Sequence, residues 1–192
     1  GVNLNITPSR HIAFSKMGML SPTGECNTFD DGANGYVRGE GAAFILMKPL
    51  QKAIDDGDAI YGVIRGSAIN HCGATYTLTY PSAEAQADVI IAAHNAADVP
   101  LQSVNYVEVH GTGTPKGDPI EIEGLMRAYS TLAEQQAIPV ENIRCGLSAV
   151  KTNIGHAEAA AGIAGLLKVL MSFKHNTLAP LRKCQQLNHR IN

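Results

Sequence analysis

The order of apolar and polar positions divides the chain into two regions. In the first, the alternating run VNLNI at 2–6 predicts a short strand, and the continuous run AAFILMKPL at 42–50 predicts a buried strand that a proline ends. Residues 21–41 between them are dense in Gly, Asn and Asp, which favours turns. A short helix is expected at 51–58, where Gly57 stops it.

The second region alternates between strands and helices. Short runs rich in β-branched residues predict strands, and longer runs with one apolar face at helical spacing predict helices. The strands are expected at 59–70, 104–110 and 143–150, and the helices at 81–99, 118–133 and 156–175. This β-α-β-α-β-α order predicts an α/β fold with a largely parallel sheet.

The expected helices carry recognisable end signals. Ser82 is positioned to cap the first, and Asp118 to cap the second, with Glu121 three residues later in a capping-box pattern. The last helix is rich in alanine and is expected to be buried on most sides, where Gly162 and Gly165 would let another backbone approach closely.

Composition and charge exclude several classes of protein. Of the 192 residues 45% are hydrophobic and 17% charged, and the net charge is −2 without a block of like charges. This argues against nucleic-acid binding and against a polybasic membrane anchor. No apolar run reaches the ~18 residues of a membrane span. The N-terminus lacks a methionine and a secretion signal, so we expect the chain to begin inside a longer, cytoplasmic protein.

The cysteines are not arranged for a metal. Cys26, Cys72, Cys145 and Cys184 lie far apart and form no CxxC pair, whereas zinc sites need closely spaced ligands. We expect no metal site and a reduced protein whose cysteines are mostly small buried hydrophobic residues.

Two histidines follow two of the expected strands. His110 comes directly after the strand at 104–110 and opens the run GTGTPKGDP, and His156 lies just beyond the strand at 143–150, at the expected start of a helix. In a parallel sheet, functional residues gather at the carboxyl ends of strands, so both should face one crevice. A helix N-terminus lowers the pKa of an imidazole, which would let neutral His156 donate a hydrogen bond to an oxyanion, with Lys151 and Glu158 flanking it.

Simpler explanations exist for each feature. An isolated histidine is more often structural than catalytic, and the glycine-rich loop could be a tight turn or a phosphate-binding loop. However, GxxxxGK[ST] does not occur and the strand–GxGxxG–helix fingerprint is not met, which disfavours nucleotide binding.

Four segments together resemble the β-ketoacyl synthases. HGTGT at 110–114 with GDPIE at 117–121, and VKTNIGHAEAAAG at 150–162, are similar to the two histidine motifs of that family. FDDGANGYVRGEGAAFILMKPL at 29–50 and INHCGATYTLTYPSAEAQ at 69–86 resemble the segments before and between them. The sequences of these motifs look most like those of the ketosynthases of modular polyketide synthases.

The resemblance implies a fold and its division. Ketosynthases have the thiolase-like fold, in which two similar α/β halves form a five-layered αβαβα sandwich. The chain would cover the end of the first half, at residues 1–52, and most of the second half, at residues 53–192.

The resemblance also implies an activity and the residues that perform it. The family joins an acyl thioester to malonyl-ACP by decarboxylative Claisen condensation, with no bound cofactor and with both substrates on the phosphopantetheine arm of acyl carrier protein. Homodimers are expected. Matched by motif, the catalytic residues are His110, His156, Lys151 and Glu158, and the substrate-binding residues are Thr112, Thr114 and Asn153.

The chain departs from the family pattern in ways that leave an alternative open. The family's nucleophilic cysteine lies in a TACSSS-like segment before the GGVNL strand, and its GFGG-type loop comes later, so neither is present and this fragment alone is predicted to be inactive. Pro115 and Lys116 replace a variable residue and a usual leucine. A non-catalytic homologue, similar to a chain-length factor or a non-elongating ketosynthase, is the alternative, which the presence of both histidines disfavours.

Overall fold

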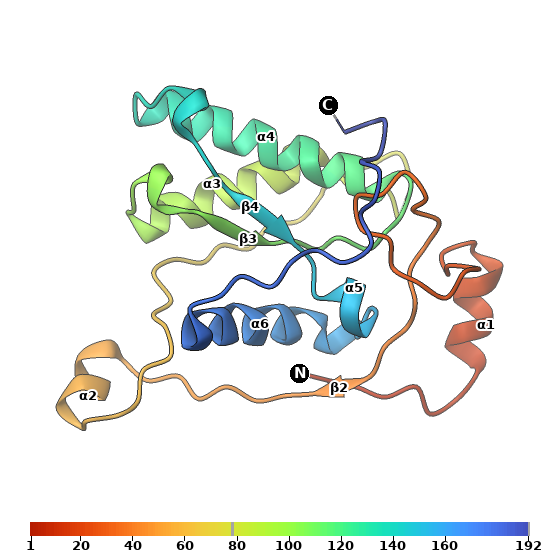
Figure 1. Ribbon diagram of the computed structural model, residues 1–192, viewed down its shortest axis with the longest axis horizontal. Coiled ribbons are helices and arrows are strands. Elements are labelled where there is room, and N and C mark those ends of the chain that lie inside the picture. The colour runs from red at the N-terminus through yellow and green to blue at the C-terminus, as the bar shows by residue number, and fades with distance from the viewer. Residues whose placement is uncertain (78, 192) are drawn as a thin grey trace.

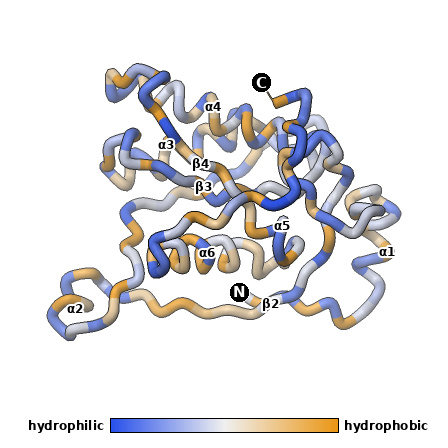
Figure 2. The backbone as a smooth tube through the Cα atoms, in the orientation of Figure 1, coloured by the Kyte–Doolittle hydropathy of each residue, from blue (hydrophilic) through white to orange (hydrophobic). Residues whose placement is uncertain are grey.

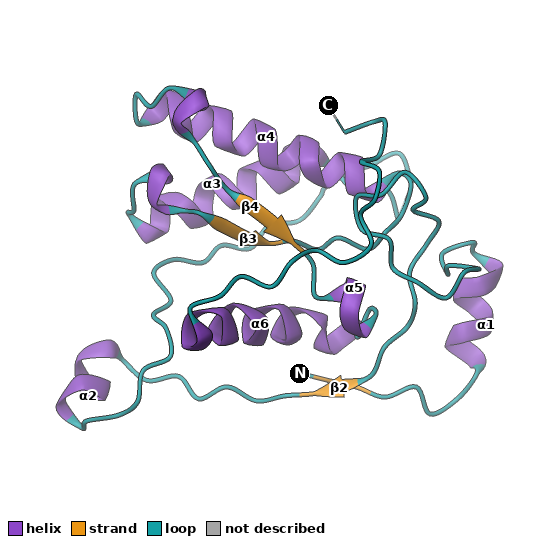
Figure 3. Ribbon diagram, in the orientation of Figure 1, coloured by secondary structure: helices purple, strands orange, loops and turns teal. Residues whose placement is uncertain are grey.

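The computed structural model describes residues 1–77 and 79–191 as helices and short strands joined by long connections (Figures 1 and 3). The helices are α1 (Ser9–Lys16), α2 (Leu50–Asp55), α3 (Ala83–Ala97), α4 (Gly117–Gln135), α5 (Lys151–Ile154) and α6 (Ala161–His175). The strands are β1 (Val2–Asn3), β2 (Gly41–Ala42), β3 (Tyr106–Glu108) and β4 (Gly146–Ser148). Short 3₁₀ turns lie at Leu101–Ser103, Val140–Asn142 and Glu158–Ala160.

A parallel pair of strands forms the centre of the molecule. Strand β3 pairs with β4 in the register Val107 to Leu147, and the connection between them contains α4. This β-α-β unit confirms the predicted parallel arrangement, since parallel neighbours need a crossover connection. Both strands are shorter than the runs that predicted them.

Layers of helix cover the two faces of this pair. Figure 1 shows α3 and α4 on one side and α6 on the other, and α3 packs along α4 over most of its length. Leu125 of α4 packs with Phe29, Val109 and Ala149 in one buried cluster. Farther along α4, Leu132 and Ala133 pack with Leu101 in a second one. The molecule is therefore an α/β layered structure, as predicted.

An extended layer lies beyond α6. The antiparallel pair β1–β2 contacts the 3₁₀ turn before α6, and a Cβ atom at Gly62 would lie 3.1 Å from the Leu170 side chain of α6. Figure 2 shows a hydrophobic stretch running from β2 towards α2 in this layer. Helix α6 therefore lies between the parallel pair β3–β4 on one side and the extended chain that includes β2 on the other.

Two predicted strands are absent from the described residues. The run at 42–50 is a strand only at Gly41–Ala42, and it is not buried, because Phe44 is 86% exposed and Leu46 is 96% exposed. The run at 59–70 forms no strand. Both have the composition of strands, but a strand also needs a hydrogen-bonding partner, and beyond the short β1–β2 pairing no strand pairing in the described residues involves either run.

The predicted helix ends are right in one case and wrong in two. Ser82 caps α3 by accepting a hydrogen bond from Ala85 N, as predicted. Asp118 does not cap α4, because the helix begins at Gly117 and the Asp118 carboxylate binds other backbone groups. His156 does not begin a helix, because α6 starts at Ala161.

Helix α6 is also less buried than its alanine-rich sequence predicts. Only Ala161 and Ser172 of this helix are buried, and Phe173 is 63% exposed. The two glycines do not admit another backbone: a Cβ at Gly165 would meet the Glu108 side chain, and one at Gly162 would meet open space.

The second cluster predicts a stability difference along α4. Replacing Leu132 by Ala removes a side chain that is 1% exposed and should lower the free energy of unfolding by about 2–5 kcal/mol. The matched control is Met126→Ala on the same helix, where the side chain is 54% exposed and the change should be within about 0.5 kcal/mol. Chemical unfolding measures both, and equal losses would contradict this account of the core.

Candidate active site

The structure brings His110 and His156 together. Their ring centroids lie 5.4 Å apart with the planes at 85°, so the edge of one ring meets the face of the other. Both residues line a cleft of about 2140 Å³ between the described residues of segments 70–77 and 79–80, helix α3 and the start of α4. The two connections that follow β3 and β4 therefore deliver imidazoles to one place, as the topology of the sheet predicts.

The backbone around His156 fixes its ring. His156 N donates to Val37 O at 2.7 Å, and Gly39 N donates to His156 O at 2.9 Å. The Nδ1 atom accepts a hydrogen bond from Glu158 N at 2.9 Å. Since a neutral imidazole carries one proton, an accepting Nδ1 places that proton on Nε2. His156 can therefore donate a hydrogen bond from Nε2.

The charge of His156 is set by its surroundings and not by a helix N-terminus. Burial lowers the pKa of His156, the positive charge of Lys151 lowers it further, and the Glu158 carboxylate partly opposes them. The helix dipole that the sequence suggested does not act as expected, because α6 begins five residues farther along the chain. The outcome is the same neutral ring at neutral pH, for a different reason.

The His110 loop is held by the start of α4. Glu121 accepts hydrogen bonds from His110 N at 2.6 Å and Gly111 N at 2.8 Å. This pairing replaces the capping box that the sequence suggested. The His110 ring is exposed at the cleft but has protein on its other sides. That burial, together with the positive charge of Lys151 and, where it is protonated, of His156, lowers the pKa of His110 to about 4.

Asp118 ties a third segment to the same loop. Its carboxylate is 1% exposed and accepts from Phe29 N at 2.8 Å, Gly113 N at 3.1 Å and Thr114 N at 3.3 Å. Burial raises the pKa of this carboxyl, and the three N–H donors oppose that rise. Asp118, which the sequence predicted to cap a helix, therefore holds the loop at 110–114 through hydrogen bonds to its backbone.

The two predicted substrate-binding threonines lie together in the cleft. Thr112 Oγ1 and Thr114 Oγ1 are 3.2 Å apart, and Thr114 Oγ1 accepts from Gly117 N at 3.2 Å. Both residues line the cleft beside His110. Asn153 is different: it is exposed on α5, lies outside the residues that line the cleft, and accepts a hydrogen bond from Thr152 Oγ1 at 3.1 Å.

Lys151 lies buried behind the histidines. It is 4% exposed, and burial lowers the pKa of its ammonium group while the carboxylates of Glu121 and Glu108 raise it. Its charge in turn lowers the pKa values of His110 and His156. Lys151 is thus placed to act through its charge.

Glu158 acts on His156 through its backbone and is held by arginine. Its Oε1 accepts from Arg38 Nε at 2.5 Å, and its Oε2 lies 3.4 Å from Arg10. The Arg38 hydrogen bond holds the pKa of this carboxyl below its ordinary value. Glu158 also has a positive φ of 43°, which turns its N–H towards the His156 ring.

Tyr36 is a site residue that the sequence did not reveal. Its ring lies 5.0 Å from the His156 ring, and it lines the same cleft. Phe14 of α1 packs against Tyr36 in turn, 6.4 Å away. Tyr36 lies in the segment 29–50. That motif indicated the family, but nothing in it predicted that this tyrosine would lie beside His156.

The four cysteines are free thiols in different surroundings. Cys26 is buried and its Sγ accepts from Val37 N at 3.2 Å, and burial raises its pKa. Cys72 is exposed at the cleft, and Cys145 and Cys184 are half-buried. The expectation that the cysteines are mostly buried is therefore wrong, because only Cys26 is.

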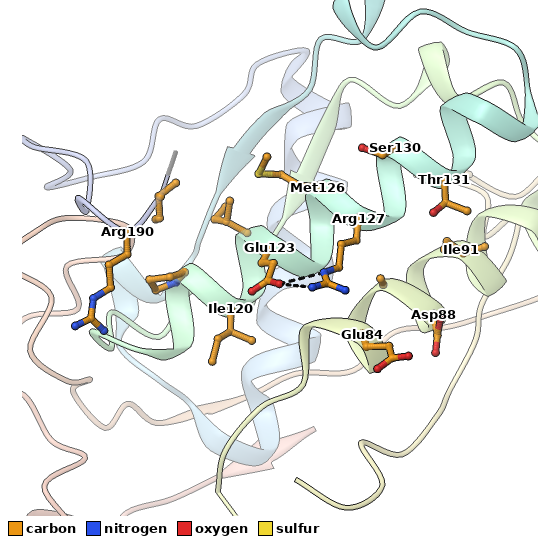
Figure 4. Close-up of a pocket in the computed structure, with 14 residues that line it drawn as sticks. Glu84, Asp88, Ile91, Ile120, Glu123, Met126, Arg127, Ser130, Thr131 and Arg190 are labelled. Atoms are coloured by element: carbon orange, nitrogen blue, oxygen red, sulfur yellow. Dashed lines mark hydrogen bonds and ion pairs between the residues drawn. The ribbon is translucent and has the colours of Figure 1, made fainter. Parts of the chain in front are cut away.

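A second cavity, of about 780 Å³, lies between α3, α4 and the C-terminal segment. Figure 4 shows Glu84 and Asp88 on one wall and the Glu123–Arg127 ion pair on the other. It contains none of the predicted site residues. In the described part of the chain, no cluster of three His, Cys, Asp or Glu residues is suited to a metal ion, and no helix has the length and hydrophobicity to cross a bilayer.

Sequence comparison identifies the family of this site. The family described as "Beta-ketoacyl synthase, C-terminal domain" matches residues 61–185, and the N-terminal domain of the same enzymes matches residues 1–53. The chain belongs to the β-ketoacyl synthase family.

Related ketosynthases have the same fold. An oxazolomycin ketosynthase domain of Streptomyces albus superposes with a TM-score of 0.94 at 39% identity, covering 100% of this chain and 33% of that domain. A ketosynthase from module 6 of the bacillaene synthase of Bacillus subtilis gives a TM-score of 0.90 at 43% identity, again with 100% and 33% covered. The architecture is therefore the thiolase-like fold, as predicted, and the chain spans one third of these domains.

The similar curated proteins are polyketide synthases. Polyketide synthase ThaG of Burkholderia thailandensis is 54% identical over 191 residues, which cover 100% of this chain and 3% of ThaG. Polyketide synthase PksM of Bacillus subtilis is 48% identical over 188 residues, with 98% of this chain and 4% of PksM covered. The ketosynthase segment thus spans only a small fraction of these relatives.

The loop geometry predicts that Gly111 cannot be replaced. Its φ is +48°, and a Cβ atom there would lie 2.6 Å from Thr28 Cγ2 and 2.8 Å from Ala149 Cβ. Gly57→Ala is the matched control, because its φ is +69° but nothing lies within 4 Å of a Cβ atom. Both variants carry the strain of positive φ, about 1 kcal/mol, and Gly111→Ala should lose at least about 1 kcal/mol more in chemical unfolding. Equal losses would show that the loop has room that the structure does not indicate.

Proposed function

We propose that this chain is the histidine-bearing part of a ketosynthase, with residues 1–52 completing the first half of the domain and residues 53–192 forming most of the second. The enzyme joins an acyl thioester to malonyl-ACP by decarboxylative Claisen condensation during polyketide synthesis. The observation that carries this proposal is the pair of neutral imidazoles, 5.4 Å apart, with His156 fixed as an Nε2 donor.

The chemistry needs hydrogen-bond donors of this kind. When the bond between the α-carbon and the carboxylate of the malonyl thioester breaks, CO₂ leaves. The electron pair of that bond stays with the thioester and forms an enolate with negative charge on the thioester oxygen. The Nε2–H of His156, with His110 beside it, stabilises that oxygen. The enolate carbon then attacks the carbonyl carbon of the acyl thioester, a new carbon–carbon bond forms, the carbon–sulfur bond breaks, and the thiolate that had carried the acyl group leaves. A preorganised donor in such a site contributes about 3–4 kcal/mol to the transition state.

The other residues support this step. Lys151 keeps the imidazoles neutral through its charge, and Glu158 sets the tautomer of His156. Thr112 and Thr114 hold the phosphopantetheine arm of acyl carrier protein, which their adjacent hydroxyls at the cleft support. No bound cofactor is needed for these steps.

We infer that the remainder of the domain supplies the nucleophile and that a second copy of the domain is the partner subunit. None of the four cysteines has the helix N-terminal setting that lowers a thiol pKa, so we assign the acyl-accepting cysteine to preceding sequence and regard this segment alone as inactive. The unpaired apolar runs at 42–50 and 59–70 would be covered by that sequence. The domain would work as a homodimer in the reducing cytoplasm, which the free thiols support.

The direct test is His156→Ala in the complete domain that carries this chain. Loss of the Nε2 donor should lower the rate of CO₂ release from malonyl-ACP about 10²–10³-fold. His175→Ala is the matched control, since that histidine is exposed at the end of α6, away from the cleft. Radiolabelled CO₂ measures the rate. A fall of less than about fivefold in His156→Ala would remove His156 from the mechanism.

The charge state of the pair predicts a pH dependence. Protonation of His156 at Nδ1 would set that N–H against Glu158 N–H, so the rate should fall as the pH falls through the lowered pKa of His156 and towards the His110 pKa of about 4. Between the ordinary histidine pKa of 6.5 and about 4, the unfolded chain binds protons that the folded chain does not, so the free energy of unfolding also falls as pH falls through this window.

Lys151→Met should move that dependence. Without the buried positive charge the histidine pKa values rise, so the acidic fall in rate should shift to higher pH. Lys116→Met, an exposed lysine beside the same cleft, is the matched control and should leave the profile in place. An unchanged profile in Lys151→Met would contradict the assigned role of its charge.

A further inference from the structure

A buried ion pair lies at the end of β3, close in sequence to His110, and the proposed chemistry does not use it. Glu108, the last residue of β3, has a side chain that is 8% exposed, and Lys168 of α6, at 11%, lies 2.8 Å from its Oε2 atom. Tyr106 OH donates to the same oxygen at 2.7 Å. Lys168 Nζ also donates to Ser148 Oγ of β4 at 2.7 Å.

The pair is not explained by stability alone. Removing two charges from water is costly, and replacing a buried pair by apolar side chains is often neutral or stabilising. Glu108 instead uses its second oxygen to accept the N–H of Val150 at 2.5 Å. Val150 directly precedes Lys151, the first residue of α5. The Glu108 carboxylate therefore binds the backbone at the turn that leads to Lys151 and then to His156.

Helix α6 is shaped to fit over this carboxylate. A Cβ atom at Gly165 would lie 3.2 Å from Glu108 Cγ, which is tighter than an ordinary contact. Gly162, one turn earlier, has nothing within 4 Å of a Cβ atom. Of these two glycines, only Gly165 lies where a side chain would crowd Glu108, so the close approach of α6 to Glu108 requires glycine at this position.

We propose that Glu108 is a positioning residue for the active site: anchored by Lys168 and Tyr106, it fixes the Val150–Lys151 turn and thereby the place of Lys151 behind the two imidazoles. The role rests on the proposed ketosynthase function. It differs from that of Glu121, which binds the His110 loop directly.

The charges around Lys151 come from several elements. Glu121 of α4 and Glu108 of β3 face it with opposite charge, and the Cys26 thiol also lies near. Lys168 offsets the charge of Glu108 from the far side. A variant of Glu108 therefore changes both the anchor of the turn and the balance of charge, and the experiment has to separate them.

The separating variants are Glu108→Leu alone and Glu108→Leu with Lys168→Met, both in the complete domain, because leucine has no oxygen to accept the Val150 N–H. The single variant leaves Lys168 without its carboxylate, and the double variant removes that buried charge. A positioning role predicts that kcat for CO₂ release falls about tenfold or more in both, with KM for malonyl-ACP within about twofold, even where the double variant recovers thermal stability. Recovery of kcat together with stability in the double variant would overturn the proposal.

Glycine variants of α6 give a gentler test. Gly165→Ala should displace Glu108 by a few tenths of an ångström and lower kcat, whereas Gly162→Ala on the same helix should leave kcat unchanged. The His110 and His156 ring signals, followed by NMR in the same proteins, should move in Gly165→Ala and stay in place in Gly162→Ala. Equal behaviour of the two glycine variants would also overturn the proposal.

These readouts distinguish the inference from the function on which it rests. If the unaltered domain released no CO₂ and formed no condensation product, the proposed function would fail. The ring signals in the Glu108 and Gly165 variants would still show whether Glu108 positions the histidine pair.

Discussion

The site depends on two carboxylates, one buried and one half-buried, that bind backbone N–H groups. Asp118 holds Phe29, Gly113 and Thr114, and Glu121 holds His110 and Gly111. Both come from the first turns of α4, so one helix end fixes the whole loop that carries the first histidine. Burying a carboxylate is costly, and burial raises the pKa of both groups, but satisfied hydrogen bonds offset that cost. The loop is therefore tied to α4 by hydrogen bonds along its length.

The same carboxylates also set the electrostatics of the site. Glu121 and Glu108 face Lys151, which allows an ammonium group to stay charged at 4% exposure. That positive charge then acts on His110 and His156, and burial acts on them in the same direction. A chain of charges of alternating sign thus ends in two uncharged imidazoles, which is the state that a hydrogen-bond donor to an enolate requires.

Much of this could be predicted from sequence, and the failures have physical causes. The order of strands and helices and the motif positions placed His110 and His156 in one cleft, because parallel topology fixes where strand ends meet. The roles of Asp118 and Glu121 were missed, since a capping pattern is local and their partners, such as Phe29, are distant in the sequence. The runs at 42–50 and 59–70 have strand composition, but pairing depends on neighbours that no local pattern can supply.

The central claim is that His156 is a neutral imidazole with its proton on Nε2, and ¹⁵N NMR of the ring nitrogens tests it most directly. At neutral pH the complete domain should show a non-protonated Nδ1, hydrogen-bonded as an acceptor, and a protonated Nε2. A ring with the proton on Nδ1, or with protons on both nitrogens, would contradict the account, since neither form can accept the Glu158 N–H.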